Sequence, residues 1–239
     1  MRTLLAAFVL NFAVLAPALA AESALKSFHA EYATLQNDSE LGRTTLDLHD
    51  NGDGSWTLRS ETNGTAGLAK IAGIHIVETS RFRWQDGRPV ALAYDYKQDG
   101  AFKQRTRHAE FDWKTHEVRV NEGGEFRYAT TPGLIDRQAV TLAIASDLLR
   151  GASRFDYKVA VKDHVEDMRY VRGASESLTV PAGTFKTLVM QREGEPGDDR
   201  RRVARSWFAE SLGWLPVQIE QTQKKGDTVT LKLVSSNRK

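Results

Sequence analysis

The side chains most able to do chemistry in this 239-residue chain are six histidines and several clusters of carboxylates. No two histidines stand four residues apart on a helical pattern, as the zinc ligands of a helix do. His164, Glu166 and Asp167 form a local polar cluster, which we interpret as an exposed strand end. An enzyme that hydrolyses an envelope polymer would need this cluster to converge with His108 and His116 in one cleft.

A second polar run, residues 49–54, resembles the start of a calcium-binding loop. It has no acidic residue at the first ligand position, and Glu61 lies one residue beyond the place of the bidentate glutamate. We therefore interpret it as a hairpin turn. The chain contains no cysteine, no Gly-x-Ser-x-Gly elbow and no glycine-rich phosphate loop between a predicted strand and a helix. We assign no catalytic residue, metal or cofactor, and the lack of a phosphate loop argues against nucleotide binding.

Two sets of side chains are candidates for ligand binding. Arg202 and Arg205 could hold a phosphate or an anionic head group, although we favour a hairpin tip whose neighbouring charges neutralise one another. Aromatic residues could line a cavity, although at strand spacing they more often fill a core. The aromatic candidates are Trp84, Tyr94, Tyr96, Phe185 and Trp207.

Most of the chain alternates apolar and polar residues with period two, which predicts strands with one buried face. Examples are the faces Phe28/Ala30/Tyr32 and Val90/Leu92/Tyr94/Tyr96. Turn residues rich in glycine, asparagine and aspartate separate these runs, at residues 51–54, 86–87 and 122–124 among others. Short strands joined in this way favour antiparallel meanders over parallel βαβ units.

Three segments differ from this pattern. Residues 139–149 predict a helix with Asp136 as N-cap and Gly151 as stop, and its middle, residues 139–145, is apolar almost all round, which predicts that the helix is largely buried. Residues 64–76 combine glycines with apolar residues and predict a short helix or apolar loop, which would act as a lid or, as we favour, a crossover. Residues 184–192 are apolar on both faces, as in a strand with the predicted helix packed over it.

Together these elements predict a mainly β fold. We expect a curved antiparallel sheet or open half barrel of many short hairpin-linked strands, covered by one largely buried helix near residues 136–150. No linker or internal repeat interrupts the pattern, so residues 21–239 are expected to form a single domain.

The first twenty residues are typical of a cleavable signal peptide. Arg2 precedes an apolar run over residues 4–15, and Ala18-Leu19-Ala20 fits a cleavage site. Without cysteine, the exported chain has neither disulfides nor an N-terminal lipid anchor. The 33 basic and 31 acidic residues of the full sequence are interspersed, which argues against a nucleic-acid partner. No later segment is apolar enough to predict a transmembrane anchor.

Motifs along nearly the whole mature chain resemble those of one bacterial envelope family. They include Leu41-Gly42-Arg43-Thr44-Thr45-Leu46, Gly67-Leu68-Ala69, Asp136 before the predicted helix, Val180-Pro181-Ala182-Gly183-Thr184-Phe185, Trp207-Phe208 and Leu215-Pro216-Val217. The chain thus resembles the family catalogued as domain of unknown function 3108. The resemblance implies a periplasmic β-rich protein and carries over no catalytic residues. The architecture is also similar to half-barrel carriers that shuttle lipids or lipoproteins across the periplasm.

Three functions follow as hypotheses. The first is a non-enzymatic periplasmic protein whose sheet and helix enclose an apolar or lipid-like ligand. The second is a structural or assembly factor that acts through a protein partner, with a filled core and an exposed strand edge. The third is the envelope-polymer hydrolase considered above. A cavity would favour the first hypothesis, and a filled core the second.

Overall fold

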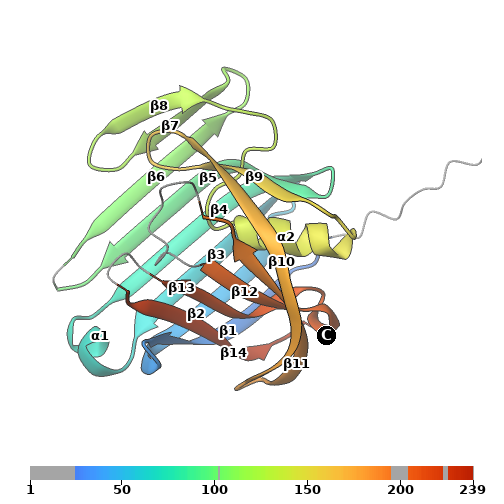
Figure 1. The fold of residues 1–239 in the computed structure, drawn as a ribbon. Coiled ribbons are helices and arrows are strands. Elements are labelled where there is room, and N and C mark those ends of the chain that lie inside the picture. The colour runs from blue at the N-terminus through green and yellow to red at the C-terminus, as the bar shows by residue number, and fades with distance from the viewer. Residues whose placement is uncertain (1–24, 102, 195–203, 223–225, 239) are drawn as a thin grey trace, which may run out of the picture.

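The computed structural model describes residues 25–101, 103–194, 204–222 and 226–238. Within these residues it contains a 14-stranded antiparallel sheet and two α-helices (Figure 1). The elements are β1 (Phe28–Gln36), β2 (Ser39–Asp50), β3 (Ser55–Gly64), α1 (Gly67–Ile71), β4 (His75–Gln85), β5 (Arg88–Asp99), β6 (Arg105–Asp112), β7 (Glu117–Asn121), β8 (Glu125–Ala129), α2 (Val140–Leu149), β9 (Phe155–Ala160), β10 (Val165–Val180), β11 (Gly183–Arg192), β12 (Ala204–Ala209), a 3-10 turn η1 (Glu210–Leu212), β13 (Leu215–Thr222) and β14 (Thr228–Ser236).

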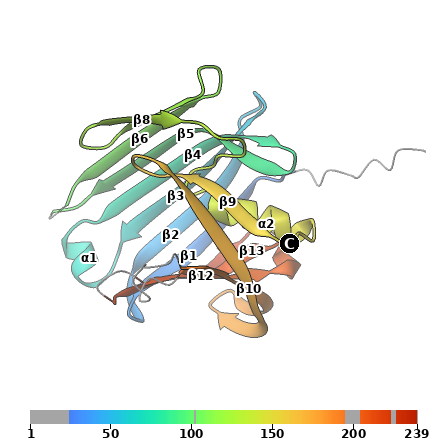
Figure 2. The same ribbon diagram turned by 45° about the horizontal axis from the view of Figure 1, so that its top comes forward.

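The sheet consists of two meanders, which are joined by the pairing of the first strand, β1, with the last strand, β14. Strands β1 to β8 pair in sequence, strands β9 to β14 pair in sequence, and β1 pairs with β14. The sheet curves strongly, and α2 lies on its concave side (Figures 1 and 2). Strands β8 and β9 are its two edges, so the predicted open, mainly β architecture with one covering helix is confirmed.

The predicted turns form where glycine and aspartate permit a positive φ. The β2–β3 hairpin turns at residues 51–54, where the Asp53 carboxylate accepts a hydrogen bond from the Ser55 amide at 2.9 Å. This calcium-loop-like run is therefore the hairpin that we predicted. The β4–β5 hairpin turns at Asp86 and Gly87, whose φ values of 52° and 72° suit a tight two-residue turn.

A β-bulge in β5 changes which residues face the core. Pairing with β4 skips Leu92, so Ala91 and Tyr94 are buried together in one cluster. The predicted face is wrong at Val90 and Leu92, which are only half-buried. A strict period of two cannot reveal an inserted residue of this kind.

The N-terminal end of α2 is fixed by a buried carboxylate, Asp136. One of its oxygens accepts hydrogen bonds from the backbone amides of Gln138 and Ala139 at 2.9 and 3.1 Å. The other oxygen accepts one from the hydroxyl of Ser80 on β4. These bonds cap a turn that precedes the helix, so α2 begins at Val140 instead of directly after Asp136.

The C-terminal end of α2 is fixed by a second carboxylate, Asp147, whose side chain is 0% exposed. It accepts two hydrogen bonds from Arg88 at 2.9 and 2.7 Å and one from the Tyr157 hydroxyl at 2.9 Å. Arg150 provides a further ion pair. The helix is thus joined to β5 and β9, and it stops before Gly151, whose φ of 69° is the predicted terminating conformation.

The segment just before α2 ties the two arms of the sheet together. The carbonyl of Leu134 accepts a hydrogen bond from the amide of Ala91 on β5 at 3.1 Å. Ile135 donates to the carbonyl of Lys158 at 3.0 Å and accepts from the amide of Ala160 at 2.8 Å, both in or at the end of β9. The open sheet is therefore bridged across its concave side by backbone hydrogen bonds.

Strand β11 packs on both faces, as its sequence predicts. Phe185 and Val189 contact the cluster formed mainly by β1–β3 and β12–β14. Leu188 and Met190 join the cluster that contains α2, β9 and β10. Leu188 and Met190 therefore pack in a cluster to which α2 contributes, as predicted for that face of β11.

Replacing Asp147 by asparagine removes the shared anion from Arg88 and Arg150. We expect the free energy of unfolding to fall by about 2–4 kcal/mol, because a buried ion pair that loses one partner is strongly destabilising. Urea unfolding followed by tryptophan fluorescence measures this loss. The matched control is Asp167→Asn, whose carboxylate is 74% exposed and whose loss should cost less than about 0.5 kcal/mol. Equal losses in both variants would contradict this role of Asp147.

Candidate functional site

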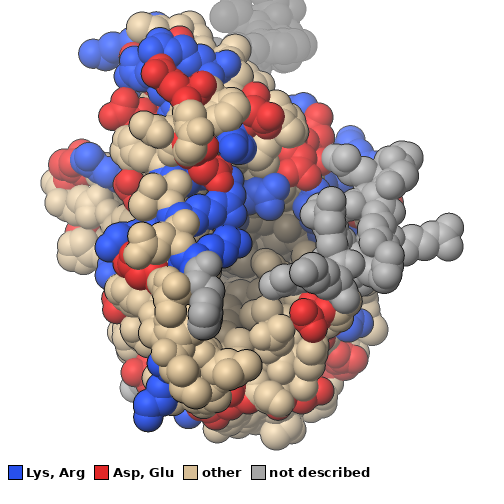
Figure 3. Space-filling view, turned by 90° about the vertical axis from the view of Figure 1, so that its left-hand side faces the viewer, with Lys and Arg blue, Asp and Glu red and all other residues tan. Residues whose placement is uncertain are grey.

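A hollow opens between the concave face of the sheet and the two helices. Figure 3 views the molecule from the α1 end and shows this hollow near its centre, with Lys and Arg side chains along its upper rim. One part of it, here called the apolar compartment, has a volume of about 580 Å³. Its aliphatic wall consists of Leu41, Leu46, Ala69, Ile74, Ile76, Ile219, Val229 and Leu231.

Hydroxyl and amide groups interrupt this aliphatic wall, and most of them hydrogen-bond to one another. The hydroxyls of Thr34, Thr44 and Thr62 form a chain across β1, β2 and β3, with both oxygen–oxygen distances at 2.7 Å. Gln138, before α2, donates to the Ser60 hydroxyl at 3.3 Å. Its side-chain oxygen is buried and has no hydrogen-bond partner among the described residues. The wall is therefore largely satisfied internally, with one acceptor available to a ligand.

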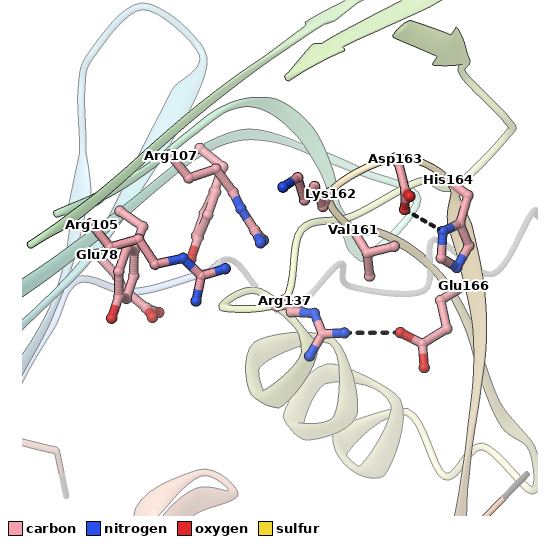
Figure 4. A pocket seen from close by; sticks show the side chains of 11 residues that line it. Glu78, Arg105, Arg107, Arg137, Val161, Lys162, Asp163, His164 and Glu166 are labelled. Carbon is pink, nitrogen blue, oxygen red and sulfur yellow. Dashed lines mark hydrogen bonds and ion pairs between the residues drawn. The ribbon is translucent and has the colours of Figure 1, made fainter. Parts of the chain in front are cut away.

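A second space, here called the polar compartment, continues from the apolar compartment and has a volume of about 540 Å³. The two share Glu78, Tyr96 and Arg137 as lining residues. Charged side chains from β6, from the segment before α2 and from the β9–β10 connection surround this space (Figure 4). The cations that line it are Arg105, Arg107, Arg137 and Lys162.

Two carboxylates each bind two arginines at this site. Glu122 accepts from Nε of Arg105 at 2.5 Å and from Nε of Arg107 at 2.6 Å. Burial pushes the pKa of Glu122 upward, but the hydrogen bonds and charges of the two arginines hold it below its ordinary value. Glu166 likewise contacts Arg137 at 3.0 Å and also pairs with Arg192. Each cluster thus carries one more positive than negative charge.

Two further carboxyls lie where the compartments meet the helix. Burial raises the pKa of Glu78 to about 7, and the negative charge of Asp136 adds to this rise while Arg107 opposes it. Burial also raises the pKa of Asp136 to about 6, against the hydrogen bonds that it accepts. Near neutral pH, Glu78 is therefore poised between its charged and neutral forms.

The structure brings two of the five predicted aromatic residues to the hollow. Tyr94 lines the polar compartment, and Tyr96 lines both compartments. Trp84, Phe185 and Trp207 pack instead with the hydrophobic cluster of β1–β3 and β12–β14, and none of them is among the described residues that line either compartment. The aromatic candidates are thus divided between the hollow and the core.

Arg205, the described member of the predicted arginine pair, is not among the residues that line the hollow. Arg205 lies on β12, where it pairs with Glu220 at 2.5 Å and stacks over the ring of Trp207 at 5.4 Å. Arg202 lies outside the described residues, as do residues 1–20. The contacts of Arg205 with Glu220 and Trp207 therefore hold its side chain on β12 and β13.

The histidines and carboxylates considered for hydrolysis are scattered. His164 and Glu166 line the polar compartment. His108 lies on the other face of β6, where it contacts Asp95 at 2.7 Å. His116 and Asp167 are exposed elsewhere, and none of the described histidine side chains hydrogen-bonds a serine. Within the described residues, no group of three His, Asp or Glu side chains is placed to hold a metal ion.

The cationic residues of the site were missed at the sequence level, although one signal was available. Arg105 and Arg107 share a face of β6 with Ala109 and Phe111, and both of these are buried. Charged residues that continue an apolar face are unusual, and here they mark a polar wall of the hollow. Lys162 carries no comparable signal, because it lies in a connection outside the strand pattern.

Comparison with known proteins places the chain in a family. The family described as a protein of unknown function, DUF3108, matches residues 27–234. The chain belongs to this family. The DUF3108 match confirms the resemblance drawn from the motifs, and a comparison with functionally curated proteins gave no match.

A similar fold occurs in the crystal structure of a β-barrel-like protein of domain of unknown function DUF1849 from Brucella abortus. The TM-score is 0.56 at 8% identity, over 89% of this chain and 98% of that chain. At this identity the likeness shows the fold alone. In the described part of this chain, neither helix has the length and hydrophobicity needed to cross a bilayer.

Replacing Glu78 by glutamine should make stability less dependent on pH. Because the pKa of Glu78 rises from its ordinary value of 4.5 to about 7 in the folded protein, the folded state binds the proton more tightly than the unfolded state does. The contribution of Glu78 to stability therefore falls as pH rises from about 4.5 to 7. Glutamine mimics the neutral form, so Glu78→Gln should gain about 3 kcal/mol over wild type at pH 8 and nothing at pH 4.

Urea unfolding at both pH values measures this gain. Glu31→Gln, at a carboxylate that is 50% exposed, is the matched control. A Glu78→Gln variant that is no more stable than wild type at pH 8 would contradict the burial of this charge.

Proposed function

We propose that this protein is a non-enzymatic periplasmic protein that binds or carries an apolar or lipid-like envelope ligand. The observation that carries the proposal is the apolar compartment, a hollow of about 580 Å³ between the sheet and the helices. Its size is typical of small-molecule sites, which measure about 300–1,000 Å³. A hydrocarbon chain that enters it would exchange contact with water for contact with eight aliphatic side chains.

The arrangement of polar groups in the hollow favours binding over catalysis. The Ser80 hydroxyl is hydrogen-bonded to Asp136, but this pair serves as a helix cap, and no described histidine side chain hydrogen-bonds Ser80. The carboxylates Glu122 and Glu166 are each engaged by two arginines. A nucleophile with a base beside it, as acyl transfer requires, is therefore not assembled among the described residues.

The periplasmic location is proposed from the signal-peptide pattern of residues 1–20. The second candidate function is an assembly factor that acts through a protein partner. The observation that favours it is the exposure of Leu68 and Ile71 on α1, each 80% exposed. A Leu68→Ser/Ile71→Ser variant that binds ligand normally but fails in the cell would favour this second function.

The proposal is tested by asking what the protein carries and what it binds. Mature protein purified from the periplasm should yield a lipid in an organic extract analysed by mass spectrometry. The uncharged apolar probe N-phenyl-1-naphthylamine should become fluorescent in its presence. No lipid in the extract together with no probe binding would overturn the proposed function.

A residue that fills the hollow should block it. Ile76→Trp places a large ring in the apolar compartment, and it should weaken binding of the uncharged probe at least tenfold. The matched control is Lys97→Trp, on β5 at a side chain that is 62% exposed, which should bind the probe as wild type does. Circular dichroism confirms that both variants are folded. Unchanged binding by folded Ile76→Trp would show that the probe binds elsewhere.

A further inference from the structure

The sheet register places apolar and hydroxyl side chains at one end of the wall of the hollow and arginines at the other end. One inward row of paired residues runs Tyr32, Thr44, Thr62, Ile76, Gln98 and Arg105, and the next runs Ala30, Leu46, Ser60, Glu78, Tyr96 and Arg107. Both rows begin at β1 among apolar and hydroxyl groups and end at β6 with an arginine. The two compartments are thus the two ends of one continuous wall.

The arginine end holds positive charge that its own carboxylates do not fully neutralise. Arg105 and Arg107 share Glu122, while Arg137 shares Glu166 with Arg192. Only one terminal nitrogen of Arg137 contacts Glu166, at 3.0 Å, and its other nitrogens have no hydrogen-bond partner among the described residues. Guanidinium groups with unused donors bind phosphate and carboxylate well.

Packing holds two of these cations in place. The guanidinium of Arg105 lies over the ring of Tyr96 at 5.7 Å, and the ammonium of Lys162 lies over the ring of Phe126 at 4.7 Å. Lys162 has no carboxylate within 4.0 Å among the described side chains. Both cations border the same space in Figure 4. Cations fixed before a ligand arrives lose less conformational freedom on binding.

Three carboxyls oppose this positive charge. Asp163 pairs with His164 at the exposed rim, at 2.7 Å. Glu78 lies at the junction of the compartments, and Asp136 lies behind it in contact with Ser80 and the helix amides. Glu78 is therefore the carboxyl that a bound anion would meet most directly.

We propose that the hollow binds an anionic amphiphile, with its hydrocarbon chain in the apolar compartment and its phosphate or carboxylate group against Arg105, Arg107, Arg137 and Lys162. This inference rests on the proposed function, because it needs the apolar compartment to accept a chain. It adds the class of ligand and the direction in which the ligand lies. The chain of such a ligand would contact the aliphatic residues of the apolar compartment, and its head group would contact the cations of the polar compartment.

The experiment compares ligands that share one chain and differ in head group. Displacement of N-phenyl-1-naphthylamine is measured with hexadecanoate, hexadecyl phosphate, hexadecanol and hexadecyltrimethylammonium, each below its micelle concentration. The two anions should displace the probe at concentrations at least tenfold lower than the alcohol, and the cation should be weakest. Inorganic phosphate alone should not displace the probe at millimolar concentration, which distinguishes an amphiphile from a free anion.

Variants then locate the head group. Arg137→Gln and Lys162→Gln should each weaken the binding of the two anions about tenfold and leave the binding of hexadecanol unchanged. Glu78→Gln should strengthen the binding of the anions. The matched control is Arg119→Gln, at a side chain that is 42% exposed and pairs with Glu110 and Glu117, and it should have no effect. Arg107→Gln is avoided as the main test because its charge is paired with the buried Glu122.

The outcomes separate the two proposals. Equal displacement by the anions and the alcohol, or anion binding unchanged in both Arg137→Gln and Lys162→Gln, would overturn the anionic-head inference and leave the apolar ligand in place. Failure of the uncharged probe and of every chain to bind would overturn the proposed function itself. Displacement by inorganic phosphate as strong as that by hexadecyl phosphate would overturn the amphiphile and assign the polar compartment to a free anion.

Discussion

The position of α2 across the concave face of the sheet depends on two buried carboxylates, one at each end of the helix. Asp136 ties its N-terminal turn to Ser80 on β4, and Asp147 ties its last turn to Arg88 and Tyr157 on β5 and β9. A nearly all-apolar helix could slide over an apolar sheet with little change in contact energy, because hydrophobic contact is not directional. Directional bonds to buried charges remove that freedom.

The position in which those bonds hold α2 determines where the hollow lies. The last turn of α2 contacts the β4–β5 turn, since Ser146 bonds to the carbonyl of Gly87. Its first turn reaches the hollow through Thr141, and α1 forms the opposite wall through Ala69. The helix thus fills one end of the curved sheet and leaves the other end open. The open end is lined by aliphatic chains on one side and arginines on the other, so it suits a ligand that combines both chemistries.

Much of the fold could be predicted from local sequence, because period-two alternation and turn residues act over a few positions. Asp136 and Gly151 marked the two ends of the helix segment for the same reason. The bulge at Leu92 could not be predicted, since it depends on pairing with β4. The role of Asp147 could not be predicted, because its partner Arg88 lies 59 residues earlier in the chain. The arginine site was missed because Glu122 and Glu166 join residues from separate elements only once the sheet is formed.

The central claim is that one end of the half barrel is a binding site with a fixed direction. A crystal structure of the protein with a fatty acid that carries bromine at the end of its chain tests this claim most directly. The account predicts an anomalous bromine peak in the apolar compartment near Leu46 and Leu231, with the carboxylate beside Arg137. A bromine peak among the arginines, or one on the outer face of the sheet, would contradict it.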